Sequence, residues 1–147
     1  MIIPVFNRIE FLEKTLISVV SQTYDNIEIV VVDDGSNEKQ KKRLVNLISL
    51  IQENTRINLN LFHQPNSGAP AARNLGVFHS SGDLIQFLDS DDILHKDKFR
   101  KSVEIFKKHE SIDIVDCYRA DMDEFDQILE NKKSGFSDKQ VFCPIWR

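Results

Sequence analysis

Ile27-Glu-Ile-Val-Val-Val-Asp-Asp-Gly-Ser36 is a nearly continuous apolar run that ends abruptly on two acids and a turn. Continuous rather than alternating runs are typical of strands buried on both faces of a parallel sheet. A second run, Leu84 to Leu88, ends in the same way at Asp89-Ser-Asp-Asp92. These stretches therefore predict two parallel strands whose carboxyl ends bring acidic side chains to one edge of a sheet.

The rest of the chain continues the alternation of strands and helices. Apolar runs at 2–6, 57–62 and 112–117 predict further strands. Helices are predicted at 11–22, around 44–51, at 69–79 and at about 97–109, because apolar side chains recur there at helical spacing. Since right-handed crossovers place helices on both faces of such a sheet, we expect an α/β fold, a three-layer α/β/α sandwich with a mostly parallel central sheet.

Length and composition narrow the class of protein. With 147 residues, 41% of them hydrophobic, we expect one domain over 1–147, with a core at 1–118 and a hairpin or loop extension at 119–147. The net charge of -4 and the scattered lysines and arginines argue against a nucleic-acid partner. No apolar run approaches the roughly 18 residues of a membrane span, and two cysteines are too few for a disulfide framework. We expect a cytoplasmic location, with attachment to the inner face of a membrane as an alternative.

The acids at the end of the 84–88 run form the densest candidate site. Asp89, Asp91 and Asp92 lie within four residues, and carboxylates this close repel one another unless a proton or a cation intervenes. An all-oxygen set of ligands suits Mg²⁺ or Mn²⁺. The alternative is a cap for the following helix, but one aspartate suffices for that. We favour a metal role, with Asp91 as a direct ligand and Asp89 as a ribose or water-mediated contact.

The pair Asp33-Asp34 follows the second predicted strand. An acid at this position can hold ribose hydroxyls or a base N–H, and Asp34 is the better candidate of the two. The alternative, a turn that caps the next helix, is equally supported because Asp, Gly and Ser all favour turns. The turn after the first predicted strand has no glycine and no Walker A lysine follows, so neither an NAD site nor a P-loop is expected.

A third candidate segment, Asn66-Ser-Gly-Ala-Pro-Ala-Ala-Arg-Asn-Leu-Gly76, starts a helix from a glycine turn. Its first amides could bind an anion, with Arg73 one turn inside the helix. Ala71, Ala72 and Gly76 would let the helix pack closely. The alternative is a tight helix junction with Arg73 facing solvent.

Taken together, six ordered segments resemble family 2 glycosyltransferases of the GT-A fold, specifically their nucleotide-sugar-binding part, over about residues 2–118. The segments are Ile3-Pro-Val-Phe-Asn-Arg8, Ser18-Val-Val-Ser-Gln-Thr-Tyr24, Ile29-Val-Val-Val-Asp-Asp-Gly-Ser36, Asn66-Ser-Gly68, Ala72-Arg-Asn-Leu-Gly76 and Gly82-Asp-Leu-Ile-Gln-Phe-Leu-Asp-Ser-Asp-Asp92. The resemblance implies a nucleotide-sugar donor, commonly linked to UDP, and a divalent cation, Mn²⁺ or Mg²⁺.

The resemblance also implies roles for individual residues. Asp89-Ser90-Asp91 would be the DxD motif, with Asp91 and Asp89 at the metal. The implied nucleotide-binding residues are Pro4 and Phe6 flanking the uracil, Asp34 at the base or ribose, Arg73 near the nucleotide, and Asn7, Asp89 and Ser90.

The implied reaction is sugar transfer with inversion at the anomeric carbon. In the family the catalytic base lies well downstream of the DxD motif, and no matching segment occurs before Arg147. Asp121, Asp123 and Glu124 match it by charge alone. We therefore expect a truncated donor-binding part without its acceptor-binding part. The acceptor, a saccharide, lipid-linked or protein hydroxyl, stays open. Apolar sheet surface exposed by truncation would favour self-association.

Two other functions compete with this reading. The chain could bind nucleotide and metal without turning over, because the acceptor site and the base are missing. It could also be a haloacid-dehalogenase-like phosphatase, since Phe87-Leu-Asp-Ser-Asp91 resembles that signature. The second is disfavoured because the motif follows the fourth predicted strand rather than the first.

Overall fold

The computed structural model describes residues 1–109 and 111–117. The chain divides into two compact units, residues 1–101 and 102–147. The elements, in chain order, are β1 (Ile2–Val5), α1 (Ile9–Val20), β2 (Glu28–Asp33), α2 (Glu38–Glu53), β3 (Asn58–His63), α3 (Ala69–His79) and α4 (Lys98–Lys108). None of these helices, within the residues described, is both long and apolar enough to cross a membrane.

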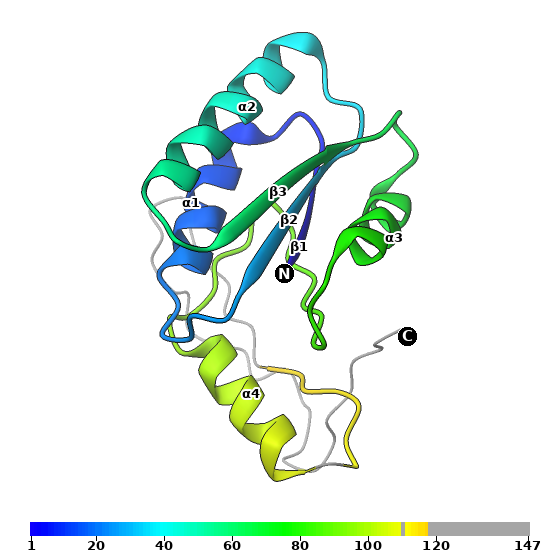
Figure 1. Ribbon diagram of the computed structural model, residues 1–147. Helices are drawn as coiled ribbons and strands as arrows, with labels where there is room; N and C mark the ends of the chain where they lie inside the picture. Colours follow the sequence, from blue (N-terminus) through cyan, green and yellow to red (C-terminus); the bar gives the residue numbers. More distant parts are fainter. Residues whose placement is uncertain (110, 118–147) are drawn as a thin grey trace, which may run out of the picture. The chain divides into compact units, whose positions relative to one another are not determined.

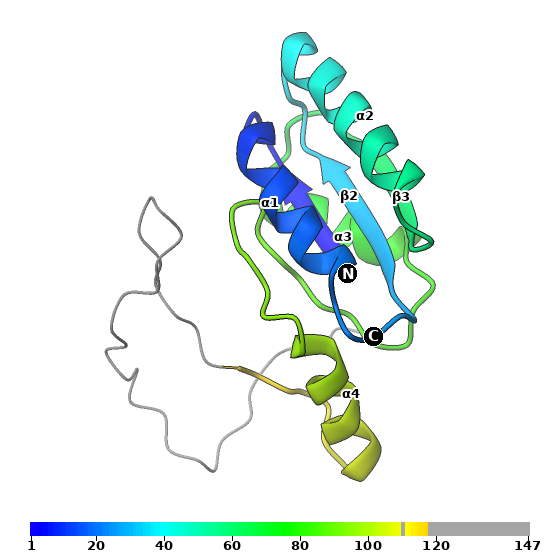
Figure 2. The same cartoon turned by 90° about the vertical axis from the view of Figure 1, so that its left-hand side faces the viewer.

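The first unit is built on a parallel sheet with the strand order β1-β2-β3. Ile2 pairs with Val30 and Glu28 with Asn58, so β2 lies at the centre of the three strands. Helices α1 and α2 cover one face of the sheet and α3 covers the other, as Figures 1 and 2 show. The predicted three-layer α/β/α arrangement with a parallel sheet is confirmed.

Side chains along each strand alternate between two apolar cores. Ile3, Val5, Ile29 and Val31 are buried among the apolar side chains of α1 and α2. Their neighbours in sequence face α3, and they are Ile2, Val30 and Val32. Both faces of the strands are therefore buried, which explains why the sequence shows continuous apolar runs.

Helix α3 packs closely on the sheet, as its small residues predict. Ala72 is fully buried, and a Cβ placed on Gly76 would overlap the Cγ2 atom of Ile2. A residue larger than glycine at position 76 would push the helix away from β1, so the close packing depends on this glycine.

The predicted strand at 84–88 is reduced to one parallel bridge, between Ile2 and Phe87. The Ile2 amide donates to Gln86 O (2.8 Å) and the Leu88 amide donates to Ile2 O (3.0 Å). The next donor on this side of β1 would be residue 4, but Pro4 has no N–H. Pairing therefore stops at Leu88, and the chain leaves the sheet at Asp89.

The strand predicted at 112–117 does not form: the residues described there have no strand structure. The apolar run lacks a neighbouring strand among the described residues, and a strand needs such a partner for its backbone hydrogen bonds. In α4, Phe99, Val103 and Phe106 are half-buried rather than buried. The hairpin or loop expected at 119–147 lies outside the described residues, and the single-domain boundary stays a prediction.

Candidate functional site

Loops that are distant in sequence meet at the carboxyl-end edge of the sheet, as the topology predicts. They follow β1 (residues 6–8), β2 (34–37) and β3 (64–68), and hydrogen bonds join them. The Asp89–Asp92 turn reaches the loop after β1 through Arg8 and helix α3 through Arg73. The sequence-predicted site residues therefore lie around one edge.

Asp34 is the centre of the hydrogen bonding between the loops after β2 and β3. Its side chain is only 4% exposed. Oδ1 accepts from Gln64 Nε2 (2.7 Å) and from the Ser67 amide (2.8 Å), while Oδ2 accepts from the Gly68 amide (2.9 Å). This carboxylate therefore fixes the loop that starts α3.

Asp33 is fully buried and serves a different loop. Its Oδ1 atom accepts from the Ser36 amide (3.0 Å), and its Oδ2 atom lies 2.9 Å from His63 Nδ1. Gly35 follows with a φ of 78°, and a Cβ there would lie 2.6 Å from the Asn66 backbone nitrogen. The predicted turn is therefore present, but it does not cap α2, since the N-cap is Asn37, whose Oδ1 atom accepts from the Gln40 amide. Asp34 also reaches a second loop.

The loop after β1 is anchored by Asn7. This residue has a φ of 54°, a left-handed conformation that asparagine tolerates better than most residues. Its amide donates to Ser36 Oγ (2.9 Å), and its Oδ1 atom accepts from the Asn37 amide (3.0 Å). Asn7 therefore joins the first two loops, while Phe6 beside it is 47% exposed and Pro4 is buried in β1.

Arginines neutralise two of the three clustered acids. Arg73 Nη2 donates to Asp89 Oδ1 at 2.6 Å, and Arg8 Nη1 donates to Asp91 Oδ2 at 2.9 Å. Guanidinium groups therefore balance the charge of these two carboxylates, and sequence reasoning missed this for Arg8. Among the described residues, no three His, Cys, Asp or Glu side chains gather closely enough to hold a metal ion by themselves.

Ser90 differs from its acidic neighbours because it is buried, at 8% exposure. Its carbonyl oxygen accepts from Thr15 Oγ1 at 2.9 Å. Sequence analysis treated the 11–22 helix as a crossover helix with an apolar face and overlooked its buried polar residues. They are Thr15 and Ser18 in α1, and Gln22 just after the helix ends at Val20.

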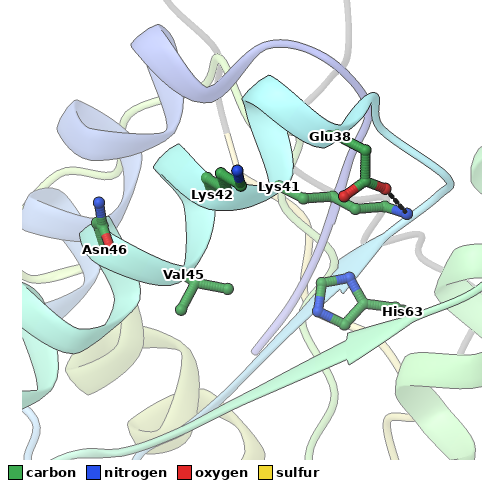
Figure 3. A pocket seen from close by; sticks show the side chains of 6 residues that line it. All are labelled: Glu38, Lys41, Lys42, Val45, Asn46 and His63. Carbon is green, nitrogen blue, oxygen red and sulfur yellow. Dashed lines mark hydrogen bonds and ion pairs between the residues drawn. The ribbon is translucent and has the colours of Figure 1, made fainter.

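An open depression of ≈ 570 Å³ lies elsewhere, between α2 and the end of β3 (Figure 3). It is lined by Glu38, Lys41, Lys42, Val45, Asn46 and His63. None of these is a predicted site residue. Lys41 pairs with Glu38, and His63 is held by the buried Asp33, so the groups in this depression serve the local structure.

Comparisons with known proteins agree with this geometry. The model of the family described as Glycosyl transferase family 2 matches residues 1–144. A Rickettsia felis protein named "Uncharacterized glycosyltransferase" is 37% identical over 150 residues, covering 98% of this chain and 24% of that protein.

Two solved structures share the fold. S. aureus TarS 1-349 in complex with UDP has a TM-score of 0.64 and 27% identity over 74% of this chain and 32% of that one. A mannosyltransferase from Pyrobaculum calidifontis, in complex with GDP-Man and Mn2+, has a TM-score of 0.64 and 22% identity, covering 78% of this chain and 32% of its own.

The chain spans about a quarter of the length of the R. felis relative and similarly small parts of the solved structures. The family assignment rules out the phosphatase alternative, because the motifs that match in order belong to a different fold. The family match over nearly the whole chain, together with the parallel sheet and its acidic edge, shows that this chain belongs to glycosyl transferase family 2.

Proposed function

We propose that the carboxyl-end edge of the sheet binds the nucleoside diphosphate of a nucleotide-sugar donor, UDP-linked, whose sugar is transferred to an acceptor hydroxyl. The observation that carries this is the pairing of Arg8 with Asp91 and of Arg73 with Asp89 at the edge where α/β sheets bind ligands. The UDP complex of TarS, which shares the fold at 27% identity, supports the choice of nucleotide.

The arginine pairs suit a diphosphate because they can exchange partners. Arg8 and Asp91 are 63% and 42% exposed, and such pairs contribute only about 0–1 kcal/mol to stability. A guanidinium binds phosphate oxygens through fixed parallel N–H groups, so a diphosphate can take over an arginine at little cost. The carboxylate that is released then becomes available to a cation.

The carboxylates that are released when a diphosphate binds the arginines suit Mg²⁺ or Mn²⁺. Both ions prefer oxygen ligands, and Mg²⁺ is commonly held by one or two carboxylates together with substrate phosphates. Asp91 and Asp89 would provide the protein oxygens, and phosphate oxygens and water would complete the shell. When bound, the cation would stabilise the negative charge that develops on the leaving diphosphate.

The base and ribose would lie beside the loops after β1 and β2. Phe6 offers an exposed aromatic face, with Pro4 and Asn7 next to it in the same segment. Asp34 keeps the proposed role at the base or ribose, because a carboxylate has about four acceptor directions and the chain uses three. Ser90 contributes through its backbone, since its carbonyl fixes the turn between the two acids.

The proposed chemistry is inverting transfer by the whole protein. A carboxylate would deprotonate the acceptor hydroxyl, which then attacks the anomeric carbon as the nucleotide leaves. We place that base, the acceptor site and the choice of acceptor in parts of the protein beyond the described residues, and the reaction in the cytoplasm. The competing function, nucleotide binding without turnover, is separated from this one by transfer activity.

Calorimetric titration of UDP into the chain, with and without Mn²⁺, tests the proposal. Binding that requires Mn²⁺ is expected for the natural chain and is expected to be lost in Asp91→Ala. Asp83→Ala is the matched control, because this exposed acid lies in the same segment, eight residues before Asp91, and the variant should bind normally. No binding by a folded sample, or equal binding by Asp91→Ala, would contradict the proposal.

A further inference from the structure

A row of three buried polar side chains lies beside the apolar core, two of them on α1 and the third, Gln22, just after the helix ends at Val20. Thr15, Ser18 and Gln22 are each less than 10% exposed, although Leu12, Leu16 and Val19 around them belong to the core. Polar groups in such surroundings are costly unless their hydrogen bonds are made. The hydrogen-bond partners of these side chains therefore indicate their structural role.

All three side chains bind the backbone of one segment, residues 90–99. Thr15 Oγ1 donates to Ser90 O (2.9 Å), and Ser18 Oγ accepts from the Leu94 amide (3.1 Å). Gln22 uses both ends of its amide: Nε2 donates to His95 O (2.9 Å), and Oε1 accepts from the Phe99 amide (3.1 Å). The partners follow the same order as the three side chains, so the segment runs along α1.

This segment needs such support because the sheet does not provide it. Pairing with β1 stops at Leu88, where Pro4 lacks an N–H, and the backbone beyond Leu88 must find other partners. The row supplies them, beginning at the residue between Asp89 and Asp91. A rigid helix thereby determines where the two carboxylates leave the sheet.

We propose that Thr15, Ser18 and Gln22 are positioning residues that hold the Asp89–Asp91 turn in the geometry that binds a nucleoside diphosphate with its cation. The proposal deepens the proposed function and rests on it for the identity of the ligand. The three side chains act through the backbone of residues 90–99. Substitutions in this row should therefore lower the affinity for the nucleotide-sugar donor, while the protein stays folded.

The chain contains a matched control for Gln22. Gln52, near the end of α2, also uses both ends of its amide: Nε2 donates to Ile57 O (3.2 Å) and Oε1 accepts from the Leu59 amide (3.0 Å). This bridge lies at the start of β3, at the opposite end of the strand from the site. Replacing either glutamine by methionine removes hydrogen bonding to a backbone carbonyl and from a backbone amide, at the site for Gln22 and away from it for Gln52.

The test measures the affinity for UDP with Mn²⁺ in Gln22→Met, Thr15→Val, Thr15→Ser and Gln52→Met, each alongside its urea unfolding midpoint. Affinity is expected to fall about 10-fold or more in Gln22→Met and Thr15→Val, a size typical of residues that orient ligand-binding groups. Thr15→Ser keeps the hydroxyl and should retain most of the affinity. Gln52→Met should bind within about twofold of the natural chain, since it leaves the ligand-orienting groups untouched.

Amide hydrogen exchange separates failure of this inference from failure of the proposed function. The Asp92 amide donates to Asp89 O within the acidic turn and has no contact with Gln22 among the hydrogen bonds above. Faster exchange at Asp92 in Gln22→Met but not in Gln52→Met is expected, whether or not UDP binds. If the natural chain binds UDP and both glutamine variants bind equally well, the positioning role is wrong. If Asp92 exchange is unchanged in Gln22→Met, the positioning role is wrong regardless of binding.

Discussion

Two acidic pairs follow apolar runs and reach the same edge of the sheet, yet the protein uses them in opposite ways. Asp33 and Asp34 are buried, and backbone amides from two loops donate to them, while the side chains of Gln64 and His63 lie within hydrogen-bond distance. Asp89 and Asp91 are exposed and each meets one arginine. A carboxylate bound by fixed backbone amides serves the fold, whereas one bound by a movable guanidinium can change partner when a ligand arrives.

The difference arises from the strands that carry the pairs. β2 is flanked by β1 and β3, and the loop after β3 turns its amides toward Asp34, while the Ser36 amide in the loop after β2 itself donates to Asp33. The 84–88 segment has only a single bridge to β1, and its end is open on the other side among the described residues. The number of neighbouring strands therefore decides how many donors each acid can find.

The largest expected effect is on stability, in Asp34→Ala. This change leaves the Ser67 and Gly68 amides and Gln64 Nε2 without their acceptor in a nearly buried place. The free energy of unfolding should fall by about 3–5 kcal/mol, since each unsatisfied donor costs about 1–3 kcal/mol. Asp91→Ala should change it by less than about 1 kcal/mol. Urea unfolding of both variants measures the contrast, and equal midpoints would refute it.

A smaller loss of stability is expected in Gly35→Ala. The φ of 78° strains any residue with a side chain, and the new Cβ would meet the Asn66 backbone nitrogen at 2.6 Å. The cost should be about 1–3 kcal/mol because the loop after β3 would have to move. Gly82→Ala is the control, since a Cβ there meets only Leu84 O at 3.6 Å. Thermal unfolding that ranks the control as the less stable variant would contradict this account.

Arg73→Lys tests the exposed pair without removing its charge. An ammonium group lacks the fork of N–H groups that matches a carboxylate or a phosphate, so the affinity for UDP should fall about 3- to 10-fold. Stability should change by less than about 1 kcal/mol, as for other exposed ion pairs. Calorimetry on this variant and on Arg43→Lys, an exposed arginine of α2, gives the comparison. Equal affinities of Arg73→Lys and Arg43→Lys for UDP would mean that Arg73 pairs with Asp89 but does not contact the nucleotide.

The sequence predicts most of the fold because local patterns determine it. The three parallel strands and α1 begin and end within about two residues of where their apolar patterns place them, and 69–79 matches α3. Helix α2 was predicted only around 44–51, and it starts earlier, at Glu38. The predictions at 84–88 and 112–117 were less accurate because a strand depends on its neighbours. Pro4 stops the pairing at 84–88, and no partner for 112–117 is found in the described part of the chain.

The sequence predicted the sheet edge at which the site lies and the acidic residues in it. It did not predict which residues pair with those acids. Nothing near Arg8 in the sequence indicates that it meets Asp91, which lies 83 residues away. Thr15 and Gln22 could have been found, because polar residues in the apolar row of an amphipathic helix need buried partners. Identifying those partners required the structure.

Asp97 lies between the two kinds of acid, because both a neutral hydroxyl and an arginine contact it. It gives the smallest expected effect, a change in the pKa of one carboxyl group. The hydrogen bond from Thr23 Oγ1 (2.9 Å) lowers the pKa of Asp97 below its ordinary value of 3.8. Partial desolvation opposes this shift, and the nearby Arg100 and His95 add to it. Because the pKa in the folded state lies below the unfolded value, the stabilisation is present above about pH 3.8 and is lost as the pH falls through the folded pKa. Thr23→Val should raise the pKa of Asp97 back toward 3.8, as followed by an NMR titration of its carboxyl group. An unchanged pKa in Thr23→Val would show that Arg100 dominates, which would place Asp97 with the arginine-paired acids rather than with those held by fixed neutral donors.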